Sequence, residues 1–325
     1  MKKKIYFFNT IGKPVRDGYA TDGKFMRTIN VVNQLNRMNI GNGNIFITNQ
    51  LNNLVNSFII FIKDDFTKKI KHIRQAKKNN NIIIVDILDW LDGQSLDDDI
   101  YDAPDLHKND YINFIDVFIC ENEYVKNKYE TKYKKPCFII KHHYDVRWHQ
   151  LKKNDNNQEK LEVLFNGYVG HKNKNCLHLN KLMENKLVTN NLAKYGQYHL
   201  SLKAEEGLYN CHISIRQKDS WEYNHKPSIK MKTAAVLNCN IITTNDISIQ
   251  ELLKKVNGED YPYLLHGSEY NDVVNMIKYA QDTYKTDIWY KGLEIMNRIK
   301  DCYDISNIVT DYYLPFFNFL FNKYC

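Results

Sequence analysis

Short apolar runs alternate along the first half of the chain with segments in which apolar residues recur at helical spacing. The runs predicted as strands are Ile5–Phe8, Asn44–Thr48, Phe58–Lys63, Ile82–Asp86, Val117–Cys120 and Phe138–Lys141. A strand with one face in water would alternate apolar and polar residues, whereas these runs are continuously apolar and rich in β-branched residues. Helical spacing between them, as in Phe25–Leu35, therefore favours an α/β fold with a parallel sheet covered by helices on both faces.

A second set of elements follows the polar segment Gln150–Lys160, which has the composition of a linker. The strands predicted here are Leu161–Phe165, Ile213–Arg216, Asn240–Thr244 and, at an edge, Tyr261–Leu265. From Ser268 onward the pattern is mainly helical. We therefore predict two α/β domains, residues 1–150 and residues 151–300, and a carboxy-terminal helix at 301–325 that packs back on the first domain.

The segment His212–Asp246 predicts a strand, a polar loop, a helix opened by Pro227, and a second strand. Proline is tolerated at the first helical position because that N–H has no partner within the helix. Free N–H groups at the helix start, with Lys226 and Lys230 beside them, favour an anion such as phosphate. Arg216 at the end of the first strand adds a planar guanidinium suited to phosphate oxygens. The alternative is an ordinary solvated helix cap.

The composition indicates a folded protein with a small positive charge. The chain has 325 residues, of which 43% are hydrophobic, enough for two domains that each bury a core. The net charge of +7 is spread along the sequence, and no nucleic-acid-binding motif is present. The longest apolar runs are too short to span a bilayer, and no signal sequence precedes the first strand. We expect a soluble, cytoplasmic protein without a transmembrane segment.

Cysteine and histidine residues do not form a recognisable metal motif. The seven cysteines are scattered and include no Cys-x-x-Cys pair, which favours buried thiols in a reducing compartment. His142, His143 and His149 lie close together in the sequence, but no cysteine stands at ligand spacing. We therefore expect no metal site.

The segment His212–Asp246 resembles the carboxy-terminal domain of GT-B glycosyltransferases. In that family a Lys-Pro-x-x-Lys helix start is followed by an Ala-rich helix, a small turn and an apolar strand. The motif reads Lys-Pro-Ser-Ile-Lys at residues 226–230. Two positions depart from the family pattern: the usual Glu falls on Thr233, and the Gly-x-Pro turn is Asn-Cys-Asn at residues 238–240.

The resemblance implies two Rossmann-like domains facing across a cleft, the first for an acceptor and the second for a nucleotide-sugar donor. Residues 166–172, Asn-Gly-Tyr-Val-Gly-His-Lys, follow a predicted strand and resemble the glycine-bearing turn that meets the donor phosphates. A plain strand-to-helix turn is the alternative. The implied donor-binding residues are Gly167, Gly170, Lys172, Arg216, Lys226, Ser228, Lys230, Thr233 and Asp246.

Several polar residues follow strands of the first domain. Asp86 and Asp89 stand at and just after a strand end, where a carboxylate can accept a proton from an acceptor hydroxyl or bind sugar hydroxyls. The alternative is that Asp86 caps a helix and that Asp89 is solvated. The resemblance implies that Glu121 and His143 also border the cleft.

The function expected is transfer of a sugar from a nucleotide-diphosphate sugar to a hydroxyl of a glycan or another glycoconjugate. Asp86, Lys230 and Arg216 are the expected catalytic residues. No metal or other cofactor is expected, because Arg216, Lys226, Lys230 and the helix-start N–H groups would stabilise the leaving diphosphate. A nucleotide-sugar epimerase of the same fold and a non-enzymatic protein that binds nucleotides or nucleic acid are the alternatives, although basic residues are not concentrated as nucleic-acid binding would require.

Overall fold

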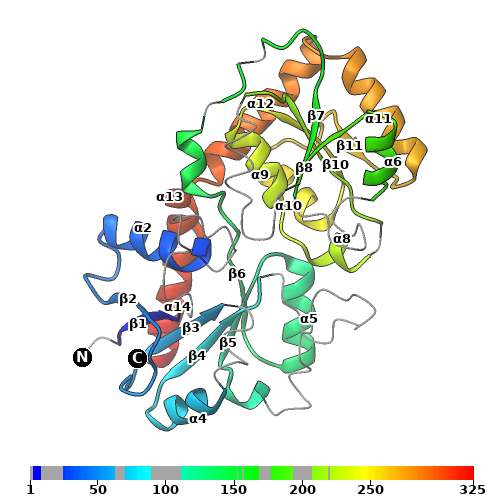
Figure 1. Ribbon diagram of the computed structural model, residues 1–325. Coiled ribbons are helices and arrows are strands. Elements are labelled where there is room, and N and C mark those ends of the chain that lie inside the picture. The colour runs from blue at the N-terminus through cyan, green and yellow to red at the C-terminus, as the bar shows by residue number, and fades with distance from the viewer. Residues whose placement is uncertain are drawn as a thin grey trace. The chain divides into compact units, whose positions relative to one another are not determined.

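The computed structural model describes residues 3–8, 25–62, 70–88, 111–151, 153–155, 157–167, 177–192, 207–218 and 220–325. They form two parallel sheets with helices, and the chain divides into two compact units (Figure 1). The first unit contains the described residues up to His142 together with Ile305–Cys325, and the second runs from His143 to Asp304. The predicted α/β fold with two parallel sheets is confirmed. The sequence-based division after residue 150 lies inside the second unit.

The first sheet has six parallel strands in the order β2-β1-β3-β4-β5-β6. Their bounds are Ile5–Phe8 (β1), Ile45–Thr48 (β2), Phe58–Ile62 (β3), Ile82–Asp86 (β4), Val117–Cys120 (β5) and Cys137–Ile139 (β6). Every residue of β3 and β5 is buried. That burial on both faces is the reason for the continuously apolar runs in the sequence.

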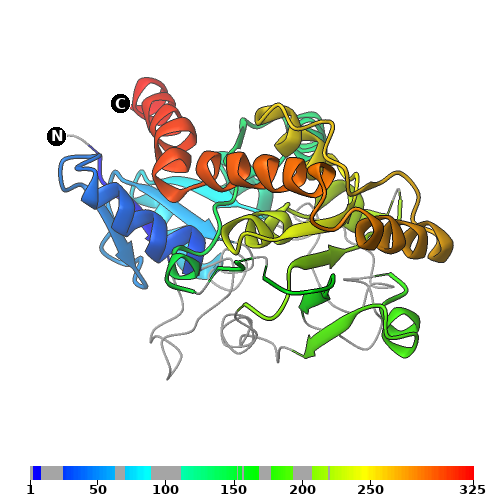
Figure 2. The same cartoon turned by 90° about the horizontal axis from the view of Figure 1, so that it is seen from above.

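Helices that follow strands of the first sheet, together with helices from the carboxy-terminal end of the chain, complete the first unit. They are η1 (Met26–Asn30), α2 (Val31–Arg37), α4 (Ile70–Lys78), η2 (Tyr111–Phe114), α5 (Glu123–Tyr133), α13 (Ile305–Ile308), η4 (Val309–Tyr313) and α14 (Leu314–Tyr324). Figure 2 shows the red carboxy-terminal helices beside the blue α2, and Gln34 of α2 donates a 3.0 Å hydrogen bond to Ser306. Phe321 of α14 packs edge-on against Phe58 of β3, with ring centroids 5.4 Å apart. The last helix is thus part of the core of the first unit.

The second sheet has five parallel strands in the order β11-β10-β9-β7-β8. Their bounds are Val163–Gly167 (β7), Thr189–Leu192 (β8), Cys211–Ser214 (β9), Asn240–Thr244 (β10) and Leu264–Leu265 (β11). Strand β8 has the sequence Thr-Asn-Asn-Leu, which lacks the apolar pattern of a strand, and it was not predicted. The predicted edge strand Tyr261–Leu265 is reduced to the two residues of β11.

The helical elements of the second unit include η3 (Val146–Gln150), α6 (Leu179–Glu184), α8 (Trp221–His225), α9 (Ile229–Val236), α10 (Ile247–Lys255), α11 (Tyr270–Asp282) and α12 (Asp287–Cys302). Helix α12 comes unusually close to β10, where Asn240 donates a 3.1 Å hydrogen bond to the carbonyl of Trp289. A Cβ added to Gly292 would lie 2.5 Å from the Asn240 side-chain oxygen, so only glycine permits this approach. Among the described helices none is both long and apolar enough to cross a membrane.

Candidate anion site in the second unit

The candidate site lies where β7, β9 and β10 end. These strands are neighbours in a parallel sheet, so their carboxyl ends share one edge. Helix α10 follows β10 directly, whereas the short α8 lies between β9 and α9. Arg216, just after β9, contacts both Pro227 before α9 and Asp246 at the start of α10, so both helices begin near that edge. In open α/β sheets, ligands bind at the carboxyl ends of the strands.

The sequence predicts that the guanidinium of Arg216 faces a bound phosphate. In the structure this guanidinium instead makes its contacts within the protein. Its Nη1 lies 2.7 Å from a carboxylate oxygen of Asp246, and its Nη2 donates a 2.9 Å hydrogen bond to the carbonyl of Pro227. Nη1 also donates to the carbonyl of Lys226 at 3.3 Å. The residue is 9% exposed, so the guanidinium fastens the loop before α9 to the start of α10.

Asp246 is likewise engaged within the protein. Its other carboxylate oxygen accepts the backbone N–H of Ile249 at 3.0 Å, which makes Asp246 the N-cap of α10. Burial raises the pKa of Asp246 to about 6, and the positive charge of Arg216 opposes that shift. The Arg216–Asp246 pair therefore shapes the edge of the site, and direct donor contacts by either residue are not supported.

Helix α9 begins at Ile229, and its N-cap residue is Ser228. Pro227 therefore lies just before the N-cap, whereas the sequence predicted it at the first helical position. The Ser228 side chain is buried and makes no capping hydrogen bond. The first N–H groups of any helix lack partners within it and carry a partial positive charge. The start of α9 therefore has the partial positive charge on which the predicted anion site depends, with Lys226 partly exposed just before it.

Lys230 lies in the first turn of α9 and reaches back over the sheet. Its ammonium is 5.2 Å from the ring centroid of Phe165, a buried residue of β7. His212 of the neighbouring strand β9 is also buried, and its pKa is lowered to about 3, first by burial and then by the charge of Lys230. A neutral histidine and a phenylalanine ring therefore flank Lys230.

His212 and Phe165 lie beside Lys230 but were not among the residues expected at this site. The available signal was the histidine itself, because its titratable ring stands among small or apolar residues in the buried strand Cys-His-Ile-Ser (β9). Phe165 carries no such signal, because a buried aromatic residue in a strand is ordinary core.

Thr233 and Lys232 face the interior and not a ligand. The hydroxyl of Thr233 donates to the carbonyl of Ile229 at 2.8 Å, and the residue is fully buried. Lys232 is also fully buried, with its ammonium 4.4 Å from the ring centroid of Tyr303. Donor binding by Thr233, as expected from its place in the motif, is therefore not supported.

The predicted glycine-bearing turn is only partly described. Gly167 is the last residue of β7 and pairs with Leu192 of β8, so its backbone stands at the same sheet edge as the start of α9. Gly170, Lys172 and, in the first unit, Asp89 lie outside the described residues.

Asp86 of the first unit is held in a buried ion pair. One of its oxygens lies 2.8 Å from Nε of Arg27 and the other accepts the N–H of Leu88 at 3.1 Å. Arg27 also donates 3.0 Å hydrogen bonds to the carbonyls of Ile140 and Lys141. Burial raises the pKa of Asp86, and Arg27 opposes the shift. With both residues fully buried, the expected role of Asp86 as an exposed proton acceptor is not supported, and the pair instead joins β4 to the chain after β6.

Glu121 and His143 are also buried, and each belongs to a different unit. The carboxylate of Glu121 accepts the N–H of His142 at 2.8 Å, and Asn122 caps α5. His143 Nδ1 donates to the carbonyl of Tyr144. These contacts fix local backbone. Within the described ranges, no three His, Cys, Asp or Glu side chains gather as metal ligands.

Similarity to known proteins is found among solved structures, and none is found by comparison of sequences. No protein-family model and no curated protein matches the chain. Among solved structures, a glycosyltransferase from Rickettsia africae ESF-5 is similar over 98% of both chains, with a TM-score of 0.63 and 10% identity. Anabaena Alr3699/HepE in complex with UDP-glucose is similar over 98% of this chain and 100% of that one, with a TM-score of 0.58 and 10% identity.

A third similar structure is the sucrose-phosphate synthase of Thermosynechococcus elongatus. It has a TM-score of 0.52 and 11% identity, and the similarity covers 82% of this chain and 74% of that chain. At these identities the similarity shows the fold. Two parallel-stranded units and these structural neighbours together establish that the chain has the GT-B glycosyltransferase fold.

Proposed function

We propose that the protein transfers a sugar from a nucleotide-diphosphate sugar to a hydroxyl of a glycan or another glycoconjugate. The observation that carries this proposal is the start of α9, where helix N–H groups lie beside Lys230 at the carboxyl edge of the second sheet. The HepE neighbour is in complex with UDP-glucose, which makes a uridine-diphosphate sugar the first donor to test.

The chemistry of this site is electrostatic. When the bond between the sugar and the diphosphate breaks, negative charge grows on the leaving oxygen, and fixed positive groups lower the energy of that transition state. The Lys230 ammonium and the N–H groups of α9 supply such charge, with Lys226 as a second cation. We propose that these groups suffice without a divalent metal ion.

The Arg216–Asp246 pair has a positioning role in this proposal. It binds the carbonyls of residues 226 and 227 on one side and caps α10 on the other, so it fixes the loop from which α9 starts. Asp86 and Arg27 hold strand ends of the first unit in the same way, and neither is assigned to the chemical step.

Binding of uridine compounds that carry two, one or no phosphates tests the proposal. UDP-glucose and UDP should raise the melting temperature, UMP less, and uridine least, because the diphosphate is the group that the α9 site recognises. Ligand at about 100 times Kd adds roughly 2.7 kcal/mol of stability. Release of UDP from UDP-glucose on addition of sugar acceptors then tests transfer. Equal stabilisation by uridine and UDP would refute the diphosphate site.

A further inference from the structure

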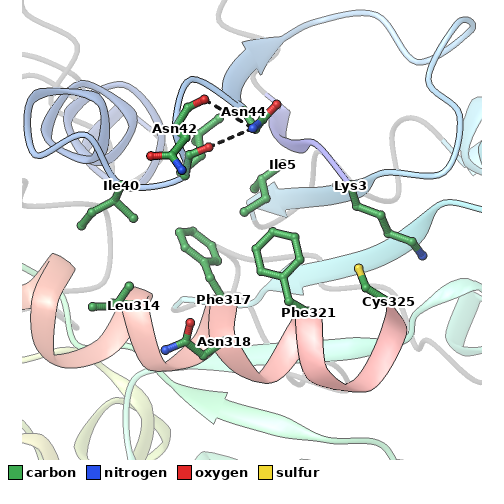
Figure 3. A pocket seen from close by; sticks show the side chains of 12 residues that line it. Lys3, Ile5, Ile40, Asn42, Asn44, Leu314, Phe317, Asn318, Phe321 and Cys325 are labelled. Atoms are coloured by element: carbon green, nitrogen blue, oxygen red, sulfur yellow. Dashed lines mark hydrogen bonds between the residues drawn. The ribbon is translucent and has the colours of Figure 1, made fainter. Parts of the chain in front are cut away.

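A separate cavity of about 420 Å³ lies within the first unit, between α14, the start of β1 and the turn that precedes β2 (Figure 3). Its apolar lining comes from Ile5, Ile40, Ile45, Leu314, Phe317 and Phe321. In Figure 3 the rings of Phe317 and Phe321 rise from α14 towards Ile40 and Ile5. The volume is in the range of small-molecule sites, roughly 300–1,000 Å³.

Asn42, Asn44 and Asn318 also line the cavity, but most of its surface is apolar, and water is a poor occupant of that part. An ordered buried water needs about two to four polar partners, and cavities lined by aliphatic and aromatic side chains offer few. A hydrocarbon chain gains about 0.8 kcal/mol for each methylene removed from water, which amounts to roughly fourfold in affinity. The lining therefore favours an aliphatic occupant.

Lys3 supplies a charge at the edge of the cavity. It is one of the lining residues and is only 8% exposed. Within the part of the chain that the structure describes, its ammonium makes no hydrogen bond or ion pair and lies 5.4 Å from the ring centroid of Phe58. Because no carboxylate of the described residues pairs with this ammonium, an anionic head group in the cavity would add an ion pair to the contact with the aromatic ring.

The position of the cavity separates it from the carboxyl edge of the sheet. Ile5 and Ile45 are the first residues of β1 and β2, so the cavity opens at the amino ends of the strands. A strand rises about 3.3 Å per residue, which puts the two edges of this sheet roughly 13–16 Å apart. The cavity is thus distinct from any ligand site at the strand carboxyl ends.

We propose that this cavity binds a single-chain anionic amphiphile of the fatty-acid type. Its hydrocarbon chain lies against Phe317, Phe321 and the isoleucines, and its carboxylate pairs with the Lys3 ammonium. The proposal is independent of the donor site in the second unit.

Calorimetric titration with decanoate, below its critical micelle concentration, tests the proposal. The full-length protein should bind one decanoate saturably, hexanoate far more weakly, and decanol more weakly than the acid. Lys3→Met should weaken decanoate at least about tenfold and leave decanol unchanged, because only the acid uses the charge. Lys4→Met is the matched control, since Lys4 is exposed, lies over the ring of Phe46 and does not line the cavity. It should bind decanoate like the wild type.

A second variant blocks the mouth of the cavity and leaves the Lys3 ammonium unchanged. Asn318 is exposed on α14 and lines the mouth, so Asn318→Trp should abolish binding of both acid and alcohol while the melting temperature stays the same. Equal effects of Lys3→Met and Lys4→Met would overturn the proposal, and so would unchanged binding by Asn318→Trp. Association with anionic vesicles or with a second copy of the chain, in place of saturable decanoate binding, would also overturn it.

Discussion

The guanidinium of Arg216 and the carboxylate of Asp246 lie 2.7 Å apart in a pair that is almost completely buried. The pair joins the end of β9 to the start of α10 across 30 residues of sequence. Removing one partner of a buried ion pair leaves the other charge without compensation, which is more damaging than loss of an exposed pair.

Arg216→Ala should therefore destabilise the second unit by about 3 kcal/mol or more, which corresponds to a fall in melting temperature of roughly 6–12 °C. Nucleotide-sugar binding should weaken as well, because the loop before α9 loses its attachment. Differential scanning calorimetry measures the first effect. Arg298→Ala, which removes an exposed arginine of α12, is the control and should change the melting temperature little. A similar small change in both variants would contradict the assigned role.

Lys230→Ala should lower kcat/KM for the donor by about tenfold to a hundredfold, since a charge-assisted contact contributes roughly 1.5–3 kcal/mol. Its melting temperature should stay close to that of the wild type. Lys254→Ala, on the exposed face of α10, is the matched control and should leave the kinetics unchanged. Lys232→Ala is unsuitable as a control because Lys232 is fully buried over Tyr303, and it should lower the melting temperature. Unaltered kinetics in Lys230→Ala would remove the donor site from α9.

His212 should make the protein sensitive to acid. Its pKa is lowered to about 3 in the folded protein, mainly by burial, against 6.5 for an ordinary histidine. Between these values the unfolded chain binds more protons, so stability is lost as the pH falls from about 6.5 towards 3. At pH 5 the loss is roughly 2 kcal/mol.

Urea unfolding at pH 7 and pH 5 measures this effect. His212→Gln has no imidazole to titrate, so its stability should change less between the two pH values. His266→Gln, which replaces an exposed histidine, should retain the wild-type pH dependence. The assignment fails if His212→Gln and the wild type lose equal stability at pH 5.

Sugar transfer should persist in excess EDTA, because protein cations and helix N–H groups neutralise the leaving diphosphate in the proposed mechanism. Measuring UDP release with and without chelator, at the same ionic strength, checks this expectation. Activity that disappears with EDTA and returns with Mn²⁺ would contradict it.

Gly292→Ala should destabilise the second unit by about 1–3 kcal/mol, because the new methyl group would lie 2.5 Å from the Asn240 side-chain oxygen and α12 would have to move. Thermal unfolding of this variant beside Glu294→Ala, an exposed substitution on the same helix, gives the measurement. Equal melting temperatures for the two variants would show that α12 adjusts without strain.

The sequence predicts a strand well where the residues of the strand itself show that it is buried. The bounds of β1, β4, β5 and β10 agree with the predicted runs, because a strand buried on both faces lacks the alternation of apolar and polar residues that marks a half-exposed strand. Strand β8 was missed because its place in the sheet comes from pairing with β7 and not from its own residues.

The site was harder to predict because a charged residue at a strand end does not reveal its partner. Arg216 and Asp86 were expected to meet ligands, but their partners are Asp246 and Arg27, which lie 30 and 59 residues away. Only the fold brings such groups together. The prediction for Lys230 and the start of α9 rests on a contiguous motif, so it needs no knowledge of the fold, and the Lys230→Ala variant tests it.

The return of α14 to the first sheet separates the order of synthesis from the order of folding. Among the described residues, the second unit is one continuous stretch, His143–Asp304, and all of it has been made before Ile305. The core of the first unit includes Phe316, Phe317 and Leu320, so its sheet lacks part of its cover until the ribosome has made the last helix. The unit whose residues emerge first is therefore completed last, and a chain truncated before α14 leaves the faces of Phe58 and Phe138 exposed to water.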